Sequence, residues 1–212
     1  MTVKPGSIKF TPKVGPNGGK SRKMNSHVLF ILSLILSLCI FSSCKVVGYS
    51  DGFNHLSSKE KNNIQVPYSS IDSLKNNGKI YKINVGQLKQ ALNNKKDAIV
   101  YEFITFCTQE YCQNPSVLEK NFKKANCDLY VIATLYDNVF NFNVLNKPIF
   151  TIDNSLYNTR VRSKYEKVFF NELTGTTQKQ RGWGSYHYFH KGKYITTFND
   201  ISDFFHYHKI ED

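Results

Sequence analysis

The sequence predicts an α/β domain with a mixed central sheet and helices on both faces. Residues 98–106 and 129–135 are almost uninterrupted runs of apolar and aromatic residues, which is typical of strands buried on both sides. Segments with helical spacing lie between these runs, and two short strand-like runs near the C-terminus are separated by Lys191 and Gly192. The order strand, helix, strand, helix, strand, then a hairpin and a helix, favours one mixed sheet.

The earlier elements have clear local signals. Residues 79–84 are predicted to form a short strand. Residues 85–95 are predicted to form a helix, because Leu88, Ala91 and Leu92 recur at helical spacing.

The later elements are predicted from similar local signals. Pro115 is predicted to open a helix that runs to Asn126, and residues 149–152 are a third candidate strand. A helix around residues 165–173 is expected to end at Gly175. The remaining elements are the hairpin strands and the closing helix, at residues 186–189, 194–198 and 201–208.

Residues 1–43 are interpreted as a secretory signal. Residues 28–41 form an apolar and serine-rich stretch of about fourteen residues, shorter than the roughly 20 that a membrane-spanning helix needs. Basic residues precede this stretch and small residues follow it. The run Phe-Ser-Ser-Cys at 41–44 resembles the lipobox of bacterial lipoproteins, which implies that Cys44 carries lipid. An uncleaved anchor and a start at Met24 remain open alternatives.

The rest of the chain is divided into a tether and a domain. Residues 44–76 are rich in Ser, Asn, Lys and Gly with little apolar periodicity, so we expect a flexible tether. Residues 77–212 are long enough for one domain. A lipid at Cys44 would hold the chain on a bacterial membrane, in the cell envelope, and we expect the domain to face the periplasm or the exterior.

The charge argues against nucleic acid as a partner. The net charge is +12, but residues 1–43 hold six basic residues and no acidic one. Removing them leaves 22 basic and 16 acidic residues, a surplus of +6 that is spread along the chain. No arginine-rich block or recognition motif is present in the sequence, so no nucleic-acid partner is expected.

The cysteines supply the one pattern that indicates chemistry. Cys39 falls in the leader and Cys44 in the lipobox, which leaves Cys107, Cys112 and Cys127. In an oxidising compartment an odd number implies one pair and one unpaired cysteine. Close spacing favours Cys107 and Cys112 as the pair. Cys127 is interpreted as a small buried apolar residue at the start of a strand.

The C-x4-C spacing restricts how this pair can join. Cα atoms five residues apart in an α-helix are about 8–9 Å apart, whereas a disulfide needs them within roughly 7 Å. Either Cys107 precedes the helix, or the first helical turn unwinds when the bond forms. We expect the helix N-terminus to favour the Cys107 thiolate as the attacking group, with Cys112 resolving. A static disulfide and two unpaired core cysteines remain open.

The order of elements around the cysteines resembles the thioredoxin-like fold over roughly residues 79–210. Residues 97–107 are similar to the strand that runs into that family's active-site cysteine, and residues 189–195 are similar to its late hairpin. The inserted residues 149–184 and the C-x4-C spacing are more typical of the redoxin and peroxiredoxin branch.

The resemblance implies roles for further residues. Pro148 is the candidate for the family's cis-proline, Arg181 for a later arginine, and Glu102 for the buried acid. The implied function is thiol–disulfide exchange on protein partners through Cys107 and Cys112. A thiol peroxidase with the same two cysteines, and a non-catalytic binding module of the envelope, are the alternatives.

Two other features are interpreted as structural. The histidines near the C-terminus do not recur with acidic or cysteine partners at ligand spacing, so no metal and no cofactor are expected. Trp183, between Gly182 and Gly184, is interpreted as the anchor of a loop rather than as a ring that faces a substrate.

Overall fold

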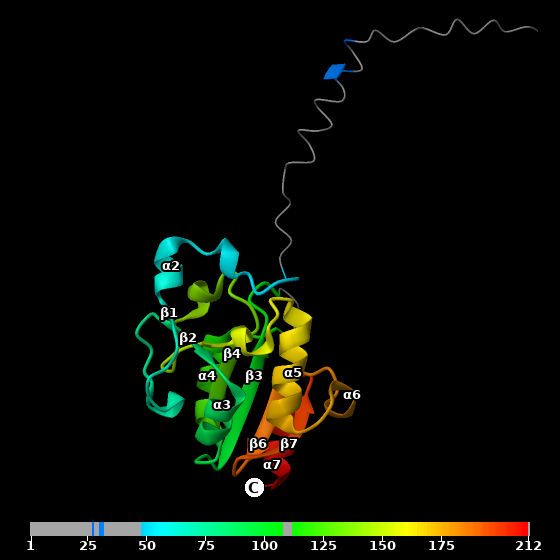
Figure 1. Cartoon of the computed structure of the whole chain (residues 1–212). Helices are drawn as coiled ribbons and strands as arrows, with labels where there is room; N and C mark the ends of the chain where they lie inside the picture. The colour runs from blue at the N-terminus through cyan, green and yellow to red at the C-terminus, as the bar shows by residue number, and fades with distance from the viewer. Residues whose placement is uncertain (1–26, 28–29, 32–47, 108–111, 212) are drawn as a thin grey trace, which may run out of the picture. The chain divides into compact units, whose positions relative to one another are not determined.

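The computed structural model describes residues 27, 30–31, 48–107 and 112–211 (Figure 1). By contacts the chain divides into Met1–Lys45 and Val46–Asp212, and the second unit is the folded domain. In the described residues, no helix combines the length and the apolar character needed to cross a bilayer. Cys39, Cys44 and Met24, and most of the leader predicted at 1–43, lie outside the described residues.

The domain is built on a seven-stranded mixed sheet with the order β1-β2-β5-β4-β3-β6-β7. β1 to β5 run parallel to one another, and β6 is antiparallel to both of its neighbours, β3 and β7. The strands are β1 (Ile64–Gln65), β2 (Ile80–Ile83), β3 (Asp97–Phe103), β4 (Asp128–Ala133), β5 (Phe150–Ile152), β6 (Tyr186–His190) and β7 (Lys193–Phe198). The predicted strands from residue 79 onward are therefore confirmed.

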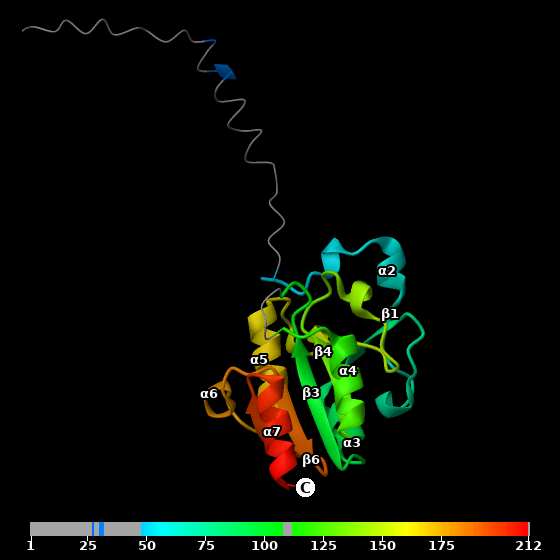
Figure 2. The same ribbon diagram turned by 180° about the vertical axis from the view of Figure 1, so that it is seen from behind.

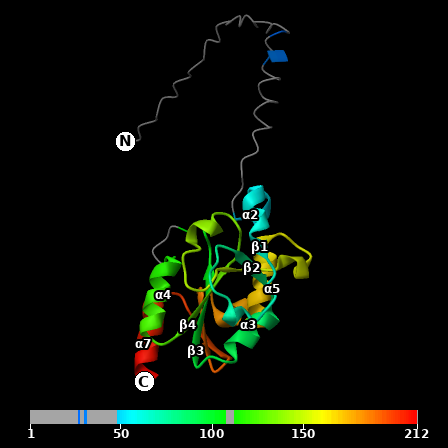
Figure 3. The ribbon, with the colours of Figure 1, turned by 90° about the vertical axis from the view of Figure 1, so that its left-hand side faces the viewer.

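Helices cover both faces of the sheet, as predicted. Figure 3 shows α3 and α5 on one side of the sheet and α4 and α7 on the other, and Figure 2 shows α4 and α7 from behind. The helices are α2 (Ser58–Asn62), α3 (Val85–Leu92), α4 (Pro115–Lys124), α5 (Arg162–Thr174), α6 (Gln178–Arg181) and α7 (Ile201–Glu211). Short 3-10 turns are η1 (Phe53–His55), η2 (Ile71–Ser73), η3 (Val139–Phe142) and η4 (Asn154–Tyr157).

Local sequence explains where the elements start and stop. Asn84 and Gln87 form a capping box at the start of α3, and the Gln87 N–H donates to Asn84 Oδ1 at 2.8 Å. Gly175 ends α5 with a φ of 68°, a conformation that favours glycine. Lys191 and Gly192 have φ values of 50° and 75°, as the tight turn between β6 and β7 requires.

The central strand β3 is buried on both faces, which explains its apolar sequence. Ala98 and Val100 belong to the core under α3 and α5. Ile99, Tyr101 and Phe103 alternate with them and belong to the core under α4 and α7. Glu102 continues the first set, so the strand period directs it towards the α5 face.

The expected flexible tether at 44–76 is wrong for residues 48–76, which are part of the folded domain. β1 pairs with β2, and Leu56, Ile71 and Leu74 are buried. Residues 44–47 lie outside the described residues.

An ion-pair cluster fixes the last part of this segment. Asp72 accepts from Lys147 Nζ and Lys95 Nζ, each at 2.9 Å, and from the Tyr130 hydroxyl at 2.9 Å. These bonds lower the pKa of Asp72 to about 2, against the opposing effect of burial, which is the largest single influence. The polar composition that indicated a tether therefore supplies a partner for two lysines in the loops before β3 and β5 and for a tyrosine on β4.

Candidate functional site

The cysteine pair lies beyond the carboxyl end of the central strand. After β3 ends at Phe103, the Cys107 N–H donates to the Ile104 carbonyl at 3.0 Å, which turns the chain. Cys107 and Cys112 form a disulfide with a Cα–Cα distance of 5.9 Å. The pairing therefore agrees with the sequence prediction, and Cys107 precedes the next helix.

The helix N-terminus expected to activate Cys107 falls on residues 108–111, which lie outside the described residues. Within the described residues, the next helix after β3 is α4, which begins at Pro115, after both cysteines. Its first turn is capped by Asn114, whose side chain accepts from the Ser116 N–H at 3.0 Å. The described helix α4 therefore does not supply the N-terminus that was expected at Cys107.

The disulfide lines a pocket of about 530 Å³ that also contains charged and aromatic side chains. The pocket lies between the end of β3, the start of α5, α6 and the loop before β6. Its lining residues are Glu102, Ile104, Phe106, Cys107, Cys112, Arg162, Glu166, Gln178, Arg181, Gly182, Trp183, Gly184 and Ser185.

Two carboxyl groups and two guanidinium groups meet in this pocket. Glu166 Oε2 accepts from Arg162 Nη1 at 2.6 Å, one helical turn away on α5. Glu166 also hydrogen-bonds Glu102 on β3. Arg181, at the end of α6, is 8% exposed and donates to Asn171 Oδ1 at 2.5 Å. Charge is thus concentrated where side chains are mostly buried.

Burial keeps this carboxyl pair partly protonated. Removal from water raises the pKa of Glu166 to about 8, and the neighbouring Glu102 charge adds to this effect. Burial also raises the pKa of Glu102, against the opposing effects of its bond to Glu166 and of the charges of Arg181 and Arg162. Near neutral pH the pair therefore retains one proton, held mainly by Glu166.

A buried histidine also contacts this group of charged side chains. His187 on β6 is fully buried, with Nε2 3.4 Å from Glu102 Oε2 and Nδ1 2.9 Å from Thr197 Oγ1. Burial lowers its pKa to about 3, so the ring is neutral. His187 therefore contributes a hydrogen-bonding group rather than a charge.

Exposed aromatic side chains form the rim of the pocket. The Trp183 ring is 85% exposed and Phe106 is 40% exposed. Gly184 holds the Trp183 loop close to β7, because a Cβ there would lie only 2.2 Å from the Phe198 carbonyl oxygen. The interpretation of Trp183 as the anchor of a loop is therefore not supported, since its side chain is exposed to solvent at the rim of the disulfide pocket.

The structure separates the residues that the resemblance had assigned to the site. Glu102 and Arg181 line the disulfide pocket. Pro148 does not, because it precedes β5, which is parallel to its neighbours, and so lies at the opposite edge of the sheet from Cys107. No cis peptide bond occurs among the described residues, so the cis-proline expected at Pro148 is also wrong.

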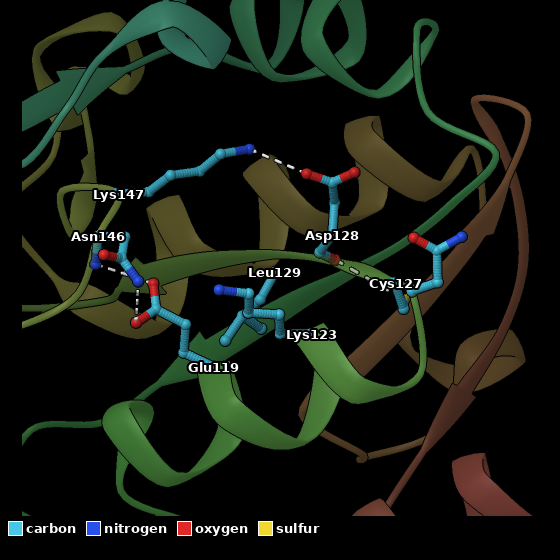
Figure 4. A pocket seen from close by; sticks show the side chains of 8 residues that line it. Glu119, Lys123, Cys127, Asp128, Leu129, Asn146 and Lys147 are labelled. Atoms are coloured by element: carbon cyan, nitrogen blue, oxygen red, sulfur yellow. Dashed lines mark hydrogen bonds and ion pairs between the residues drawn. The ribbon is translucent and has the colours of Figure 1, made fainter.

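Cys127 lies at that opposite edge as well. Figure 4 shows it next to Asp128 at one side of an open hollow, and Lys147 reaches from the other side to pair with Asp128 at 3.1 Å. Cys127 is 6% exposed, and burial raises the pKa of its thiol. It is a free, buried cysteine, in agreement with its interpretation as a small apolar residue.

Sequence reasoning missed Glu166 and Arg162. A signal was present, because Arg162, Glu166 and Phe170 recur every four residues and so share one side of α5. Phe170 is fully buried, which indicates that this side faces the sheet. A charged pair on an inward-facing stripe is unusual and marks a candidate site.

No family model, no curated protein and no solved structure matches the chain. The fold and site define an α/β protein with a seven-stranded mixed sheet and a disulfide in a charged pocket at the carboxyl edge. Among the residues that the structure describes, no three His, Cys, Asp or Glu side chains gather in a way that could hold a metal ion.

Proposed function

We propose that the chain is an exported, lipid-anchored thiol–disulfide oxidoreductase of the thioredoxin-like type, with Cys107 and Cys112 as its redox pair. The observation that carries the proposal is the shared pocket. The disulfide is partly exposed and lies in one pocket with a mostly buried carboxyl pair that retains one proton. A purely structural disulfide does not need buried titratable groups, which lower the stability of a fold.

The sheet supports the thioredoxin-like assignment. β3, which leads to the cysteines, lies between β4 and β6, and β6 opens the antiparallel hairpin with β7. This is the arrangement that the resemblance implies, with α3 and α4 on opposite faces. The run Phe-Ser-Ser-Cys at 41–44 supports export and lipidation of Cys44.

The exchange proceeds by two attacks at sulfur. A partner thiolate attacks one sulfur of the Cys107–Cys112 bond, which breaks as a mixed disulfide forms and the other cysteine leaves as a thiolate. A second partner thiolate then attacks the partner sulfur of the mixed disulfide, the bond to the remaining cysteine breaks, and that cysteine leaves as a thiolate. The partner loses two electrons and two protons and becomes a disulfide, and Cys107 and Cys112 become two thiols.

The pocket residues have separate roles in this exchange. Arg162 and Arg181 favour thiolate over thiol, because a nearby positive charge lowers a thiol pKa. Glu166 and Glu102 hold a proton close to the sulfurs, and this proton is available to the leaving thiolate.

An exchange assay on the mature chain tests the proposal. With a dithiol-reduced protein substrate or its disulfide form, we expect the parent chain to exchange thiols and Cys107→Ser to lose this activity. Cys127→Ser is the matched control, because it removes a buried cysteine at the other edge of the sheet. Exchange that survives Cys107→Ser would remove Cys107 from the mechanism.

A thiol peroxidase is the second candidate, and the location of Arg181 in the disulfide pocket favours it. In that reaction the Cys107 thiolate attacks the terminal oxygen of a hydroperoxide, the O–O bond breaks, the other oxygen leaves as water or an alcohol after taking up a proton, and a sulfenic acid forms on Cys107. Cys112 then displaces water from the sulfenic acid to form the disulfide. Peroxide consumption by the reduced chain, lost in Arg181→Lys, would favour this candidate.

A further inference from the structure

The chain enters the folded domain at the rim of the disulfide pocket. The Gly48 carbonyl accepts from Arg162 Nε at 2.9 Å, and the Tyr49 carbonyl accepts from the Arg162 N–H at 3.0 Å. Gly48 also packs on Phe106, because a Cβ at Gly48 would lie 2.6 Å from the Phe106 ring. Both Arg162 and Phe106 line the disulfide pocket.

This entry point is fixed to the start of α5 by further bonds. Ser50 forms a β-bridge with Val161, and the Asp51 N–H donates to the Arg160 carbonyl at 3.0 Å. The Asp51 carboxylate, 3% exposed, accepts from Arg160 Nη2 at 2.5 Å. Figure 1 shows this segment beside the N-terminal end of α5. The anchor side of the chain is therefore held next to the disulfide.

Cys44, the expected lipid anchor, is close in sequence to this entry point. Four residue steps separate Cys44 from Gly48, and an extended chain covers at most about 14 Å in four steps. A domain that begins at Val46 and ends at Asp212 is about 40 Å across. If Cys44 carries lipid, the pocket rim cannot lie on the side of the domain that faces away from the bilayer.

The exposed side chains around the entry point suit this location. Trp183, Tyr49 and Phe106 are 85%, 67% and 40% exposed. Tryptophan and tyrosine are favoured at the level of lipid headgroups, where one end of the ring is apolar and the other is hydrated.

We propose that the disulfide pocket is presented to the surface of the bilayer, and that its redox partner is a membrane-embedded protein whose thiols lie at headgroup level. The inference rests on the proposed function, because it needs both lipid at Cys44 and a reactive disulfide. A short tether then raises the effective concentration of this one class of partner. A soluble protein substrate gains nothing from the tether.

The test compares the full lipidated chain with a variant that carries about 20 Gly and Ser residues between Lys45 and Val46, which adds a mean reach of about 25 Å. Both chains are reconstituted in phosphatidylcholine vesicles that contain a lipid with a thiol on its headgroup. Two headgroup thiols become one disulfide as Cys107 and Cys112 become thiols. Increasing the tether from four residues to about 24 lowers effective concentration by 6 to the power 3/2, or about 15-fold.

We therefore expect the headgroup thiol to reduce the parent roughly tenfold faster than the variant, whereas a soluble dithiol reduces both equally. Equal rates with the headgroup thiol would overturn the inference and leave the proposed function intact. A disulfide that resists the soluble dithiol, or a Cys44 without lipid by mass spectrometry, would instead overturn the proposed function.

A second readout does not depend on thiol exchange. Trp183 is the single tryptophan of the sequence, so its fluorescence reports on the pocket rim alone. Nitroxide groups on lipid headgroups are expected to quench it in the parent and to quench it less in the lengthened variant. Equal quenching in the two chains would contradict the proposed orientation.

Discussion

Replacing Glu166 by glutamine should stabilise the domain while it alters the candidate site. The Glu166 side chain is only 16% exposed and lies beside Glu102, and its pKa rises from 4.5 to about 8. Since the folded protein binds this proton more tightly than the unfolded chain, stability falls as the pH rises from 4.5 to about 8. Glutamine resembles the protonated acid, so it can accept from Arg162, donate to Glu102 and avoid this loss.

The magnitude follows from the pKa difference. In the unfolded chain the Glu166 carboxyl has a pKa of 4.5, so pH 7 lies 2.5 units above it. One pKa unit corresponds to 1.36 kcal/mol, so the expected gain in stability for Glu166→Gln at pH 7 is about 3 kcal/mol. At pH 5 only half a unit separates the pH from that pKa, and the gain falls to about 1 kcal/mol.

Urea unfolding at the two pH values measures this gain. Glu172→Gln is the matched control, because Glu172 lies on the same helix and is exposed; it should change stability by less than about 0.5 kcal/mol. A Glu166→Gln domain that is no more stable than the parent at pH 7, or whose gain is the same at pH 5, would refute the interpretation of the buried pair.

Three further predictions concern the rest of the fold. Asp72→Asn should lower the free energy of unfolding by about 2 kcal/mol at pH 7, since the folded-state pKa is lowered to about 2 from 3.8. The loss should disappear as the pH falls through that interval, which acid-range unfolding curves would show. In the reduced, folded chain, an alkylating reagent should modify Cys107 but not Cys127, as peptide mass mapping would show; equal labelling would contradict the burial of Cys127. A chain that starts at residue 77 should unfold at lower temperature than one that starts at residue 46, because it lacks β1 and the buried Ile71; equal melting temperatures would restore the tether interpretation.

Elements whose signals are local could be predicted from the sequence. Gly175 ends α5, and Lys191 with Gly192 turns the hairpin, because each position needs a backbone conformation that few residues adopt. The apolar run of β3 indicated a strand buried on both faces, since strand residues alternate between two cores.

Features that depend on residues far apart in the chain could not be predicted from the sequence. Residues 48–76 carry few apolar side chains at regular spacing and β1 is only two residues long, so the capping box of Ser57 and Glu60 at α2 is a weak local sign against a tether. Its order comes from distant partners, such as the pairing of β1 with β2 and the ion pair of Asp72 with Lys147, 75 residues away. The carboxyl pair likewise joins Glu102 on β3 to Glu166 on α5, and only the packing of these elements brings them together.

The central claim is that the Cys107–Cys112 disulfide is redox-active, and its reduction potential tests this most directly. The mature chain is equilibrated in thiol–disulfide buffers of graded potential, and the two cysteines are quantified by alkylation and mass mapping. We expect one reversible two-electron transition between about −120 and −270 mV, the range of disulfide exchange proteins. A bond that remains oxidised to below about −300 mV, as structural disulfides do, would contradict the claim.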